Sequence, residues 1–171
     1  MIDDTSPAAT KSGSITVSHL FGEITWLLSQ SPLHRHFTLA DLEWLVMPPL
    51  LHRQFHIFYD DGKPVGLATW ARCNEGATAK LRNGVLDPDH RLTLDEWASG
   101  DDVWLVDLVA PFGTAENRHN EIMLADLICG PLAGQAFTFH ETDAVTGRRS
   151  ERIMSADAGE RLRESIMQAS S

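Results

Sequence analysis

The chain has 171 residues, a formal net charge of −10 and two cysteines, which suits one domain with a sizeable core. The acidic balance argues against nucleic acid or an anionic membrane as the main partner, and two cysteines are too few for a disulfide framework. The polar, acidic start does not resemble a secretory signal, and no apolar run is long enough to span a bilayer. We therefore expect a cytoplasmic protein.

The N-terminal quarter predicts a loose arm followed by a helix. Residues 1–15 are rich in Ser, Thr, Ala and Gly, which is typical of a flexible N-terminal arm. Apolar residues then recur at helical spacing from Val17 to Leu28, so one face of this segment should be buried. Pro32 ends the helix, because the residue before a proline avoids the helical region. We expect residues 16–171 to form a single domain.

A second helix and a hairpin come next. Thr38 and Asp41 resemble an N-terminal capping box, and we expect Pro48 and Pro49 to close the helix that follows. Residues 54–59 and 64–73 contain the aromatic and branched side chains typical of strands. The Asp-Gly pair between these two segments favours a tight hairpin turn.

The stretch around Asp107 is the central strand of the prediction. Residues 104–109 are apolar on both faces except for this carboxylate, and a Pro-Phe-Gly sequence stops the run. A helix at 116–129, a second hairpin at 135–154 and a final amphipathic helix follow. The order of helices and hairpins predicts an α+β (α/β sandwich-like) fold with a mainly antiparallel central sheet flanked by helices.

Asp107 needs a partner, because an unpaired buried charge is costly. We nominate His34, which lies on the turn after the first helix. A histidine beside a carboxylate has a fixed tautomer and is usable as a general base near neutral pH. The alternatives are a buried hydrogen-bonded pair without a catalytic role, or two residues that never meet. Ser31 is either a nucleophile, a donor to a substrate or a residue that shapes the turn, and no Gly-x-Ser-x-Gly elbow is present.

Other ligand motifs are missing or incomplete. The His34/His36 and His52/His56 pairs lack a third ligand, so we expect no metal. No Walker loop or Gly-x-Gly-x-x-Gly motif is present, and neither is the Arg/Gln-x-x-Gly-x-Gly/Ala loop with which acetyltransferases hold coenzyme A pyrophosphate. No cofactor-binding residue can be assigned.

Two long motifs carry a resemblance to a known family. Residues 20–28 (LFGEITWLL) with 31–35 (SPLHR), and residues 96–101 (EWASGD) with 104–113 (WLVDLVAPFG), occur in this order. Together they resemble the signatures of the RTX toxin-activating lysine acyltransferases, the toxin-activating C proteins of the haemolysin-activating type. The likeness covers roughly residues 18–115.

The resemblance implies a Gcn5-type N-acetyltransferase fold, often dimeric, so we also expect a homodimer. It implies transfer of a fatty acyl chain from acyl carrier protein to internal lysines of an RTX protoxin, with no permanently bound cofactor. The family's catalytic histidine and aspartate fall on His34 and Asp107, and Ser31 is a supporting residue. Direct transfer and a transient acyl-enzyme on His34 both remain open.

Two alternatives to this function are a coenzyme A-dependent small-amine acetyltransferase and a non-catalytic binder or chaperone of an RTX protein. A basic patch, Arg148, Arg149 and Arg152, either protects a strand edge or docks an acidic carrier protein. The five tryptophans are most simply core residues, although some could line an acyl-chain groove.

Overall fold

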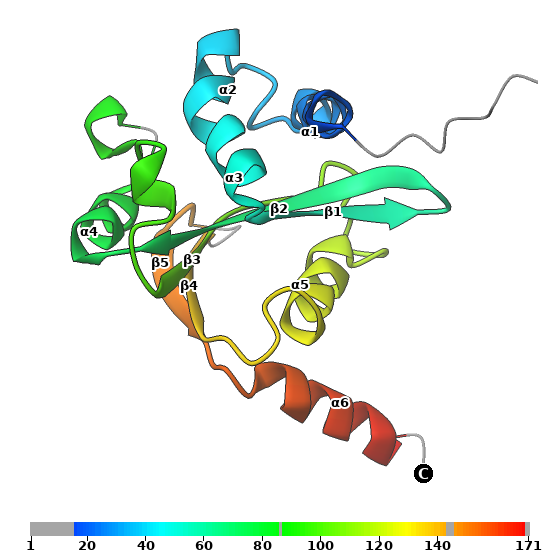
Figure 1. Ribbon diagram of the computed structural model, residues 1–171. Helices are drawn as coiled ribbons and strands as arrows, with labels where there is room; N and C mark the ends of the chain where they lie inside the picture. Colours follow the sequence, from blue (N-terminus) through cyan, green and yellow to red (C-terminus); the bar gives the residue numbers. More distant parts are fainter. Residues whose placement is uncertain (1–15, 86, 143–145, 170–171) are drawn as a thin grey trace, which may run out of the picture.

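The computed structural model describes residues 16–85, 87–142 and 146–169 (Figure 1). The predicted N-terminal arm lies outside them. Among the described helices, none is long and apolar enough to cross a membrane. The elements follow in the order α1 (Val17–Gln30), α2 (Leu39–Leu45), α3 (Met47–His52), β1 (Phe55–Asp60), β2 (Lys63–Cys73), α4 (Glu75–Asn83), the short 3-10 helices η1 (Pro88–His90) and η2 (Asp95–Trp97), β3 (Asp102–Val109), α5 (His119–Cys129), β4 (Phe137–Thr142), β5 (Arg149–Met154) and α6 (Ala158–Ala169).

The five strands form one mixed sheet in the order β1-β2-β3-β4-β5. Neighbouring strands are antiparallel except for β3 and β4, which are parallel and are joined through α5. This confirms the predicted α+β class and the mainly antiparallel sheet flanked by helices.

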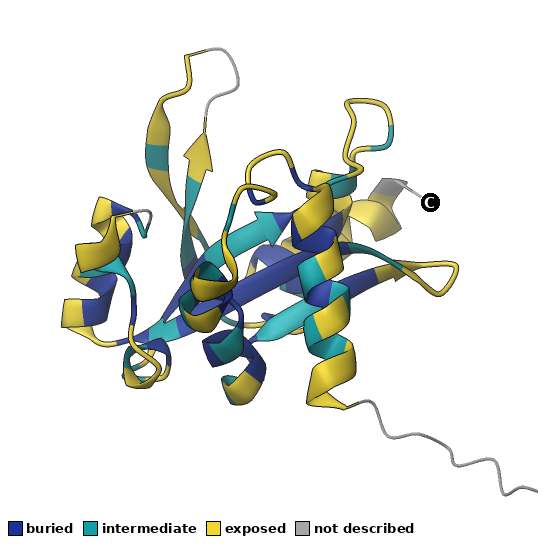
Figure 2. Ribbon diagram, turned by 90° about the horizontal axis from the view of Figure 1, so that it is seen from above, coloured by how far each residue is buried: buried dark blue, intermediate teal, exposed yellow. Residues whose placement is uncertain are grey.

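The contact between β3 and β4 is short. Within these two described strands the parallel register is recorded at one position, where Trp104 faces Thr138. Figure 2 shows the β4–β5 hairpin running away from the other three strands. The sheet therefore divides beyond Trp104, with β3 on one side of the division and β4 on the other.

Helices cover both faces of the sheet. Figure 1 shows α1, α2 and α3 on one face and α5 on the other. The first face holds an apolar cluster that includes Leu27 of α1, Leu67 of β2 and Val109 of β3. The second holds a cluster that includes Leu105 of β3 and Leu127 of α5. Burial of these side chains is the main force that holds the two layers on the sheet.

A β-bulge decides which face Asp107 occupies. Thr69 of β2 pairs with Asp107, whereas its neighbour Trp70 pairs with Leu105, so Val106 is an extra residue on β3. Strand side chains alternate between faces, and one inserted residue reverses the alternation beyond it. Leu105 points toward α5, but Asp107 lies on the face covered by α1–α3.

Local sequence signals explain most of the connections. The β1–β2 turn has positive φ at Asp61 (46°) and Gly62 (74°), as a tight two-residue hairpin loop requires. The predicted capping box is confirmed at α2, where Asp41 Oδ2 accepts from the backbone N–H and hydroxyl of Thr38 at 2.8 and 2.9 Å.

The prediction that Pro48 and Pro49 close the second helix is wrong. Both residues lie inside α3, near its first turn, and α2 ends before them at Leu45. Proline is well suited to the start of a helix, because its missing N–H would have no partner there and its φ is already helical. The proline pair therefore begins a helix and does not end one.

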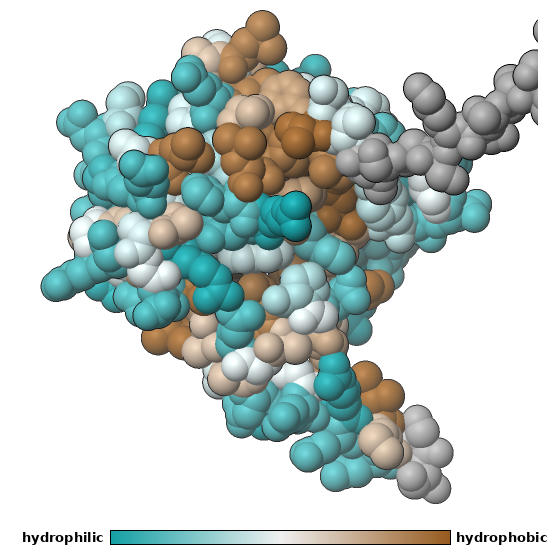
Figure 3. All heavy atoms as spheres, viewed as in Figure 1, coloured by the Kyte–Doolittle hydropathy of each residue, from teal (hydrophilic) through white to brown (hydrophobic). Residues whose placement is uncertain are grey.

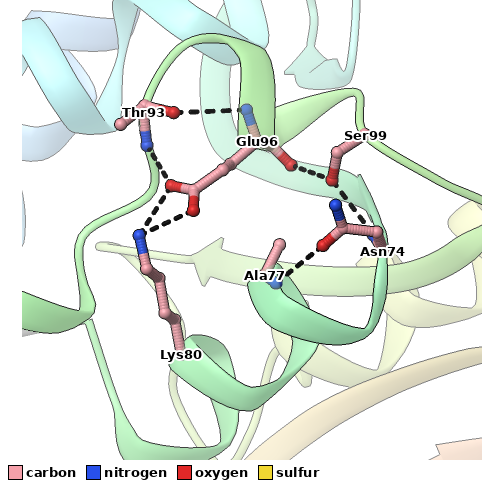
Figure 4. A network of polar contacts seen from close by, with 6 residues as sticks. All are labelled: Asn74, Ala77, Lys80, Thr93, Glu96 and Ser99. Atoms are coloured by element: carbon pink, nitrogen blue, oxygen red, sulfur yellow. Dashed lines mark hydrogen bonds and ion pairs between the residues drawn. The ribbon is translucent and has the colours of Figure 1, made fainter.

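A polar clamp fixes the segment that leads into β3 (Figure 4). Lys80 of α4 binds both carboxylate oxygens of Glu96 at 2.7 and 2.8 Å, and the Thr93 backbone N–H donates to the same carboxylate at 2.8 Å. Ser99 donates to the Glu96 carbonyl and accepts from the Asn74 N–H. These bonds tie η2 to α4 immediately before the central strand begins.

Candidate functional site

His34 and Asp107 meet, as we predicted from the sequence. The Nε2 atom of His34 lies 2.7 Å from Oδ2 of Asp107. The imidazole side chain is 7% exposed and the carboxylate 21% exposed, so the contact is largely shielded from bulk water. Such shielding strengthens a charge-assisted hydrogen bond.

Ser31 completes a chain of three side chains. Its Oγ lies 2.8 Å from Nδ1 of His34 in a buried contact. An ionised Asp107 can only accept, so it takes the Nε2 proton of a neutral imidazole. The Ser31 hydroxyl then donates to Nδ1. Both ring nitrogens are thus engaged, and the tautomer of His34 is set by its two partners.

The end of α1 positions His34. Ser31 is the C-cap of α1, and its carbonyl accepts from the backbone N–H groups of His34 and Arg35 at 3.1 and 2.9 Å. The Phe37 ring meets the imidazole edge-on, with 5.3 Å between centroids. The helix itself is anchored in the core through Leu27 and Leu28. The turn is therefore rigidly attached to the sheet face on which Asp107 lies.

The pair lines a cavity of about 790 Å³. Its walls come from α2 and the turn before it, from β3, from α5 and from the β4–β5 hairpin. Since α2 and α5 cover opposite faces of the sheet, the cavity passes between the diverging strands β3 and β4. Its lining residues are Leu33, His34, Phe37, Trp44, Leu45, Val85, Leu105, Val106, Asp107, Leu108, Asn120, Leu124, Phe139, His140, Glu141, Thr142 and Arg149.

The walls of this cavity are mostly apolar, and apart from Asn120 of α5 the polar groups gather in two places. His34 and Asp107 lie on the β3 side, while His140, Glu141 and Arg149 lie on the β4–β5 side. Burial and then the positive charge of Arg149 lower the pKa of His140 below its usual value. A largely apolar cavity with a few convergent polar groups is the usual form of a small-molecule or acyl-chain site.

The other histidines that we considered as metal ligands do not belong to a cluster of ligands. His52 ends α3 and its Nε2 contacts the Leu94 carbonyl, while His56 faces Asp126 of α5 at 3.5 Å. Across residues 16–85, 87–142 and 146–169, no group of three or more His, Cys, Asp or Glu side chains is arranged to hold a metal ion. The absence of a metal remains a prediction.

The tryptophans divide into three groups. Trp70, Trp97 and Trp104 are buried core residues, as the simplest interpretation predicted. Trp44 lines the cavity, in line with the groove alternative. Trp26 is 44% exposed, so the expectation of a core position is wrong for it.

Much of the cavity wall could not be predicted from the sequence. Phe139 and His140 belong to a strand that meets β3 only through a parallel contact, and no local pattern reveals that contact. The bulge at Val106 was also missed, because a bulge changes which residues face one another without breaking the apolar run.

A hydrogen-bonded histidine and carboxylate at the wall of a large, mostly apolar cavity are typical of the class of enzymes that use general acid–base catalysis. Comparison with protein families is consistent with this class. The model of the RTX toxin acyltransferase family, HlyC, matches residues 14–156, and the chain belongs to that family. The family predicted from the two sequence motifs is confirmed.

Curated relatives cover a shorter region. The leukotoxin-activating lysine-acyltransferase LktC serotype A11 of Mannheimia haemolytica is 39% identical over 57% of this chain and 56% of its own length. The RTX-I toxin-activating lysine-acyltransferase ApxIC of Actinobacillus pleuropneumoniae is 38% identical, over 55% and 52%. The protein-lysine myristoyltransferase RtxC of Kingella kingae is 36% identical, over 54% and 53%. The chain spans about half the length of the curated relatives it matches.

Proposed function

We propose that this protein is a protein-lysine N-acyltransferase that moves a fatty acyl chain from acyl carrier protein to internal lysines of an RTX protoxin and so activates it. The observation that carries the proposal is the 2.7 Å contact between His34 and Asp107 at the wall of the 790 Å³ cavity, in a chain of this family. The lysine-acyltransferase activities of LktC, ApxIC and RtxC point in the same direction.

The reaction needs a base and then an acid. A lysine amine is protonated at neutral pH and must lose a proton before its nitrogen attacks the thioester carbonyl. In our proposal His34 takes this proton, Asp107 holds the imidazolium, and the new N–C bond forms as the C–S bond breaks. The imidazolium then returns a proton to the departing thiolate, and the nitrogen of the new amide releases its second proton to solvent. His34 ends the cycle neutral, as it began.

Ser31 has a supporting role in this scheme. With Nε2 donating to Asp107, the lone pair of the neutral imidazole lies on Nδ1, where the Ser31 hydroxyl donates. A hydroxyl can accept one proton while it donates another, so Ser31 relays the proton from the amine to Nδ1. An acyl group held transiently on His34 or on Ser31 is the covalent alternative.

The bulge on β3 supplies a candidate oxyanion donor. Val106 is the residue left out of the one-to-one ladder with β2, and it lines the cavity beside Asp107. A bulge leaves its extra residue unpaired and disrupts the strand ladder locally. In the proposed mechanism the backbone N–H of Val106 stabilises the negative charge that develops on the thioester oxygen.

A carrier-protein donor is favoured over coenzyme A by the loop between β3 and α5. The acetyltransferase pyrophosphate motif is missing from the sequence. In addition, the N–H groups of Thr114, Asn117 and His119 are occupied by the side chains of Thr114 and Asn117. A pyrophosphate at this helix start would find these donors already used.

We infer a Gcn5-type N-acetyltransferase arrangement, which the diverging parallel strands and the cavity between them support. We also propose that residues 16–171 form one domain, that the protein works as a homodimer in the cytoplasm, and that no cofactor is bound permanently.

Intact-mass analysis tests the proposed function. An RTX protoxin is incubated with acyl-carrier-protein thioesters and either wild type, His34→Ala or Asp107→Asn. We expect an acyl-sized mass gain on lysine with wild type and a rate lower by at least about 10²-fold with each variant. Acylation with coenzyme A donors alone would favour the small-amine acetyltransferase class. Protoxin binding without acylation from any donor would favour the binder.

A further inference from the structure

The cavity has a second polar end that the proposed chemistry does not use. On the β4–β5 hairpin, Arg149 of β5 faces Thr142 of β4 in the antiparallel register, and both residues line the cavity. His140, two residues before Thr142 on β4, lines the same wall and lies against Trp104, with 5.5 Å between ring centroids. Arg149 and His140 therefore stand across the division of the sheet from the catalytic pair.

Among the described arginines of this hairpin, Arg148 and Arg149 make no ion pair with a carboxylate, and of these two only Arg149 lines the cavity. Two neighbouring carboxylates are already paired with other arginines: Glu151 with Arg82 at 3.1 Å and Glu141 with Arg152 at 2.8 Å. Within the described part of the chain, Arg149 makes no ion pair with a carboxylate. It thus brings an uncompensated positive charge to the cavity of a protein whose net charge is −10.

Gly84, at the end of α4, forms the floor beneath this guanidinium. A Cβ built on Gly84 would lie 2.8 Å from Nη1 of Arg149, so the guanidinium rests directly over the glycine. Gly84 has a φ of 91°, a conformation that glycine adopts without strain. The Arg149 side chain therefore spans from β5 to the end of α4, next to the cavity-lining Val85.

His140 adds a neutral donor beside this charge. Burial and the charge of Arg149 lower its pKa, while the carboxylate of Glu151 acts weakly in the opposite direction. The imidazole is then neutral at physiological pH and carries one N–H and one lone pair. A guanidinium with a neutral N–H donor nearby is a suitable arrangement for a phosphate oxygen, because arginine binds phosphate through paired N–H groups.

We propose that Arg149, supported by His140, binds the phosphate of the donor's phosphopantetheine arm, so that the arm lies through the cavity with its thioester at His34 and Asp107. This inference rests on the proposed function for the identity of the donor. Strand geometry agrees with it. From the shared position of Trp104 and Thr138, the strands continue by three residues to Asp107 and by four to Thr142, or roughly 10 and 13 Å along diverging directions. Asp107 and Thr142 therefore lie beyond the division of the sheet, on its opposite sides, and the arm would run between them.

The experiment compares two small donors that differ only in the phosphate, octanoyl-4′-phosphopantetheine and octanoyl-pantetheine, by calorimetric titration. For the wild type we expect the phosphorylated compound to bind at least about 10-fold more tightly, and for Arg149→Gln we expect this ratio to fall toward 1. Arg148→Gln is the matched control, since it removes the same charge from the preceding residue, which does not line the cavity. It should keep the wild-type ratio.

Three results would overturn the inference. The first is that the affinity ratio of the two compounds stays at its wild-type value in Arg149→Gln. The second is that it falls equally in Arg148→Gln, which would indicate an effect of general surface charge. The third is that wild type binds the two compounds equally well. Thermal unfolding of each variant tests whether Arg149 has a purely structural role at the end of α4. In that case Arg149→Gln would lower the midpoint of unfolding and leave the affinity ratio unchanged.

A kinetic arm separates this inference from the proposed function. With octanoyl-acyl carrier protein as donor, Arg149→Gln should raise KM with little change in kcat. Octanoyl-coenzyme A contains the same phosphate, so assays with it in parallel show which of the two donors the protein uses. If wild type transfers no acyl group but the binding ratio depends on Arg149, the proposed function fails and the phosphate site stands. If transfer occurs and the ratio ignores Arg149, only the phosphate site fails.

Discussion

At the scale of single residues, the site is defined by how His34 shares its two ring nitrogens. Asp107 holds one and Ser31 holds the other, both at hydrogen-bond distance and both largely buried. A buried imidazole with two fixed partners cannot turn freely, so its ring plane and its tautomer are set before a substrate arrives. Such preorganisation is what a general base requires.

The Ser31 relay leads to a prediction. Ser31→Ala removes the hydroxyl that contacts Nδ1 of His34, so we expect kcat to fall by about 10²-fold while His34 and Asp107 keep their bond. Stability should fall by only about 1 kcal/mol, the usual net value of one hydrogen bond. Initial rates of protoxin acylation, followed by intact mass, measure the first effect, and urea unfolding measures the second.

Ser31→Thr is the control, because it keeps the hydroxyl and should recover part of the rate. An unchanged rate in Ser31→Ala would mean that the hydroxyl only shapes the turn. An acyl adduct on wild-type enzyme incubated with donor alone, lost in Ser31→Ala, would replace the relay with a covalent acyl-serine.

The sequence was sufficient to nominate His34 and Asp107 as the proposed catalytic pair but not to orient them. One carboxylate in an apolar strand required a partner, and a histidine fixed at a helix end was available. By simple alternation, Asp107 would have shared a face with Leu105 and pointed toward α5. Only the bulge at Val106 brings it to the face of α1 and His34, and a bulge depends on the pairing with β2, which the sequence of β3 alone does not contain.

At the scale of elements, the clamp between α4 and η2 leads to a pH-dependent prediction. Burial raises the pKa of Glu96, but the bonds from Lys80 and Thr93 outweigh it, so the pKa lies below its usual value of about 4.5. A carboxylate whose pKa is lower in the folded state stabilises the fold above the unfolded-state value. That contribution is lost as the pH falls through the folded-state value.

We therefore expect Glu96→Gln to lower the free energy of unfolding by about 1 kcal/mol at pH 7. The difference from wild type should shrink as the pH falls below about 4.5. Urea unfolding at pH 7, 5 and 4 measures it, with the exposed Glu164→Gln on α6 as the control for loss of a surface charge. A difference that stays constant across this range would contradict the assigned role of the carboxylate.

Elements with strong local signals were predictable, and elements placed by distant contacts were not. The Asp-Gly turn at Asp61 and Gly62 identified the first hairpin, and the box at Thr38 and Asp41 identified α2. Pro48 and Pro49 were misjudged because proline both ends one helix and begins another, and only the preceding backbone distinguishes the two. The parallel meeting of Trp104 with Thr138 has no local signature, so the cavity between β3 and β4 could not be foreseen.

At the scale of the whole molecule, the sheet is held together less firmly at β3 and β4 than elsewhere. The three strands β1–β3 form one extended antiparallel ladder, and β4–β5 form another. The two ladders meet at one parallel register position and through α5. Figure 3 shows that the outer surface carries an apolar area toward α2 amid a mainly polar surface. A ligand in the cavity would contact both ladders at once.

The last prediction follows from this bridging. A non-reactive thioether analogue of acyl-acyl carrier protein binds the folded state only, so at 100 times its dissociation constant it should add about 2.7 kcal/mol to the free energy of unfolding. For a chain of this size, that corresponds to a rise in Tm of roughly 5–10 °C. Differential scanning calorimetry measures the shift.

Asp107→Asn should keep most of this rise in Tm, because this variant retains the cavity and loses mainly the chemistry. Carrier protein without an acyl chain should give a smaller shift, since the apolar wall formed by Leu105, Leu124 and Phe139 is then left empty. Equal shifts with and without the acyl chain would mean that the carrier docks on the surface and that the chain does not enter the space between the two ladders.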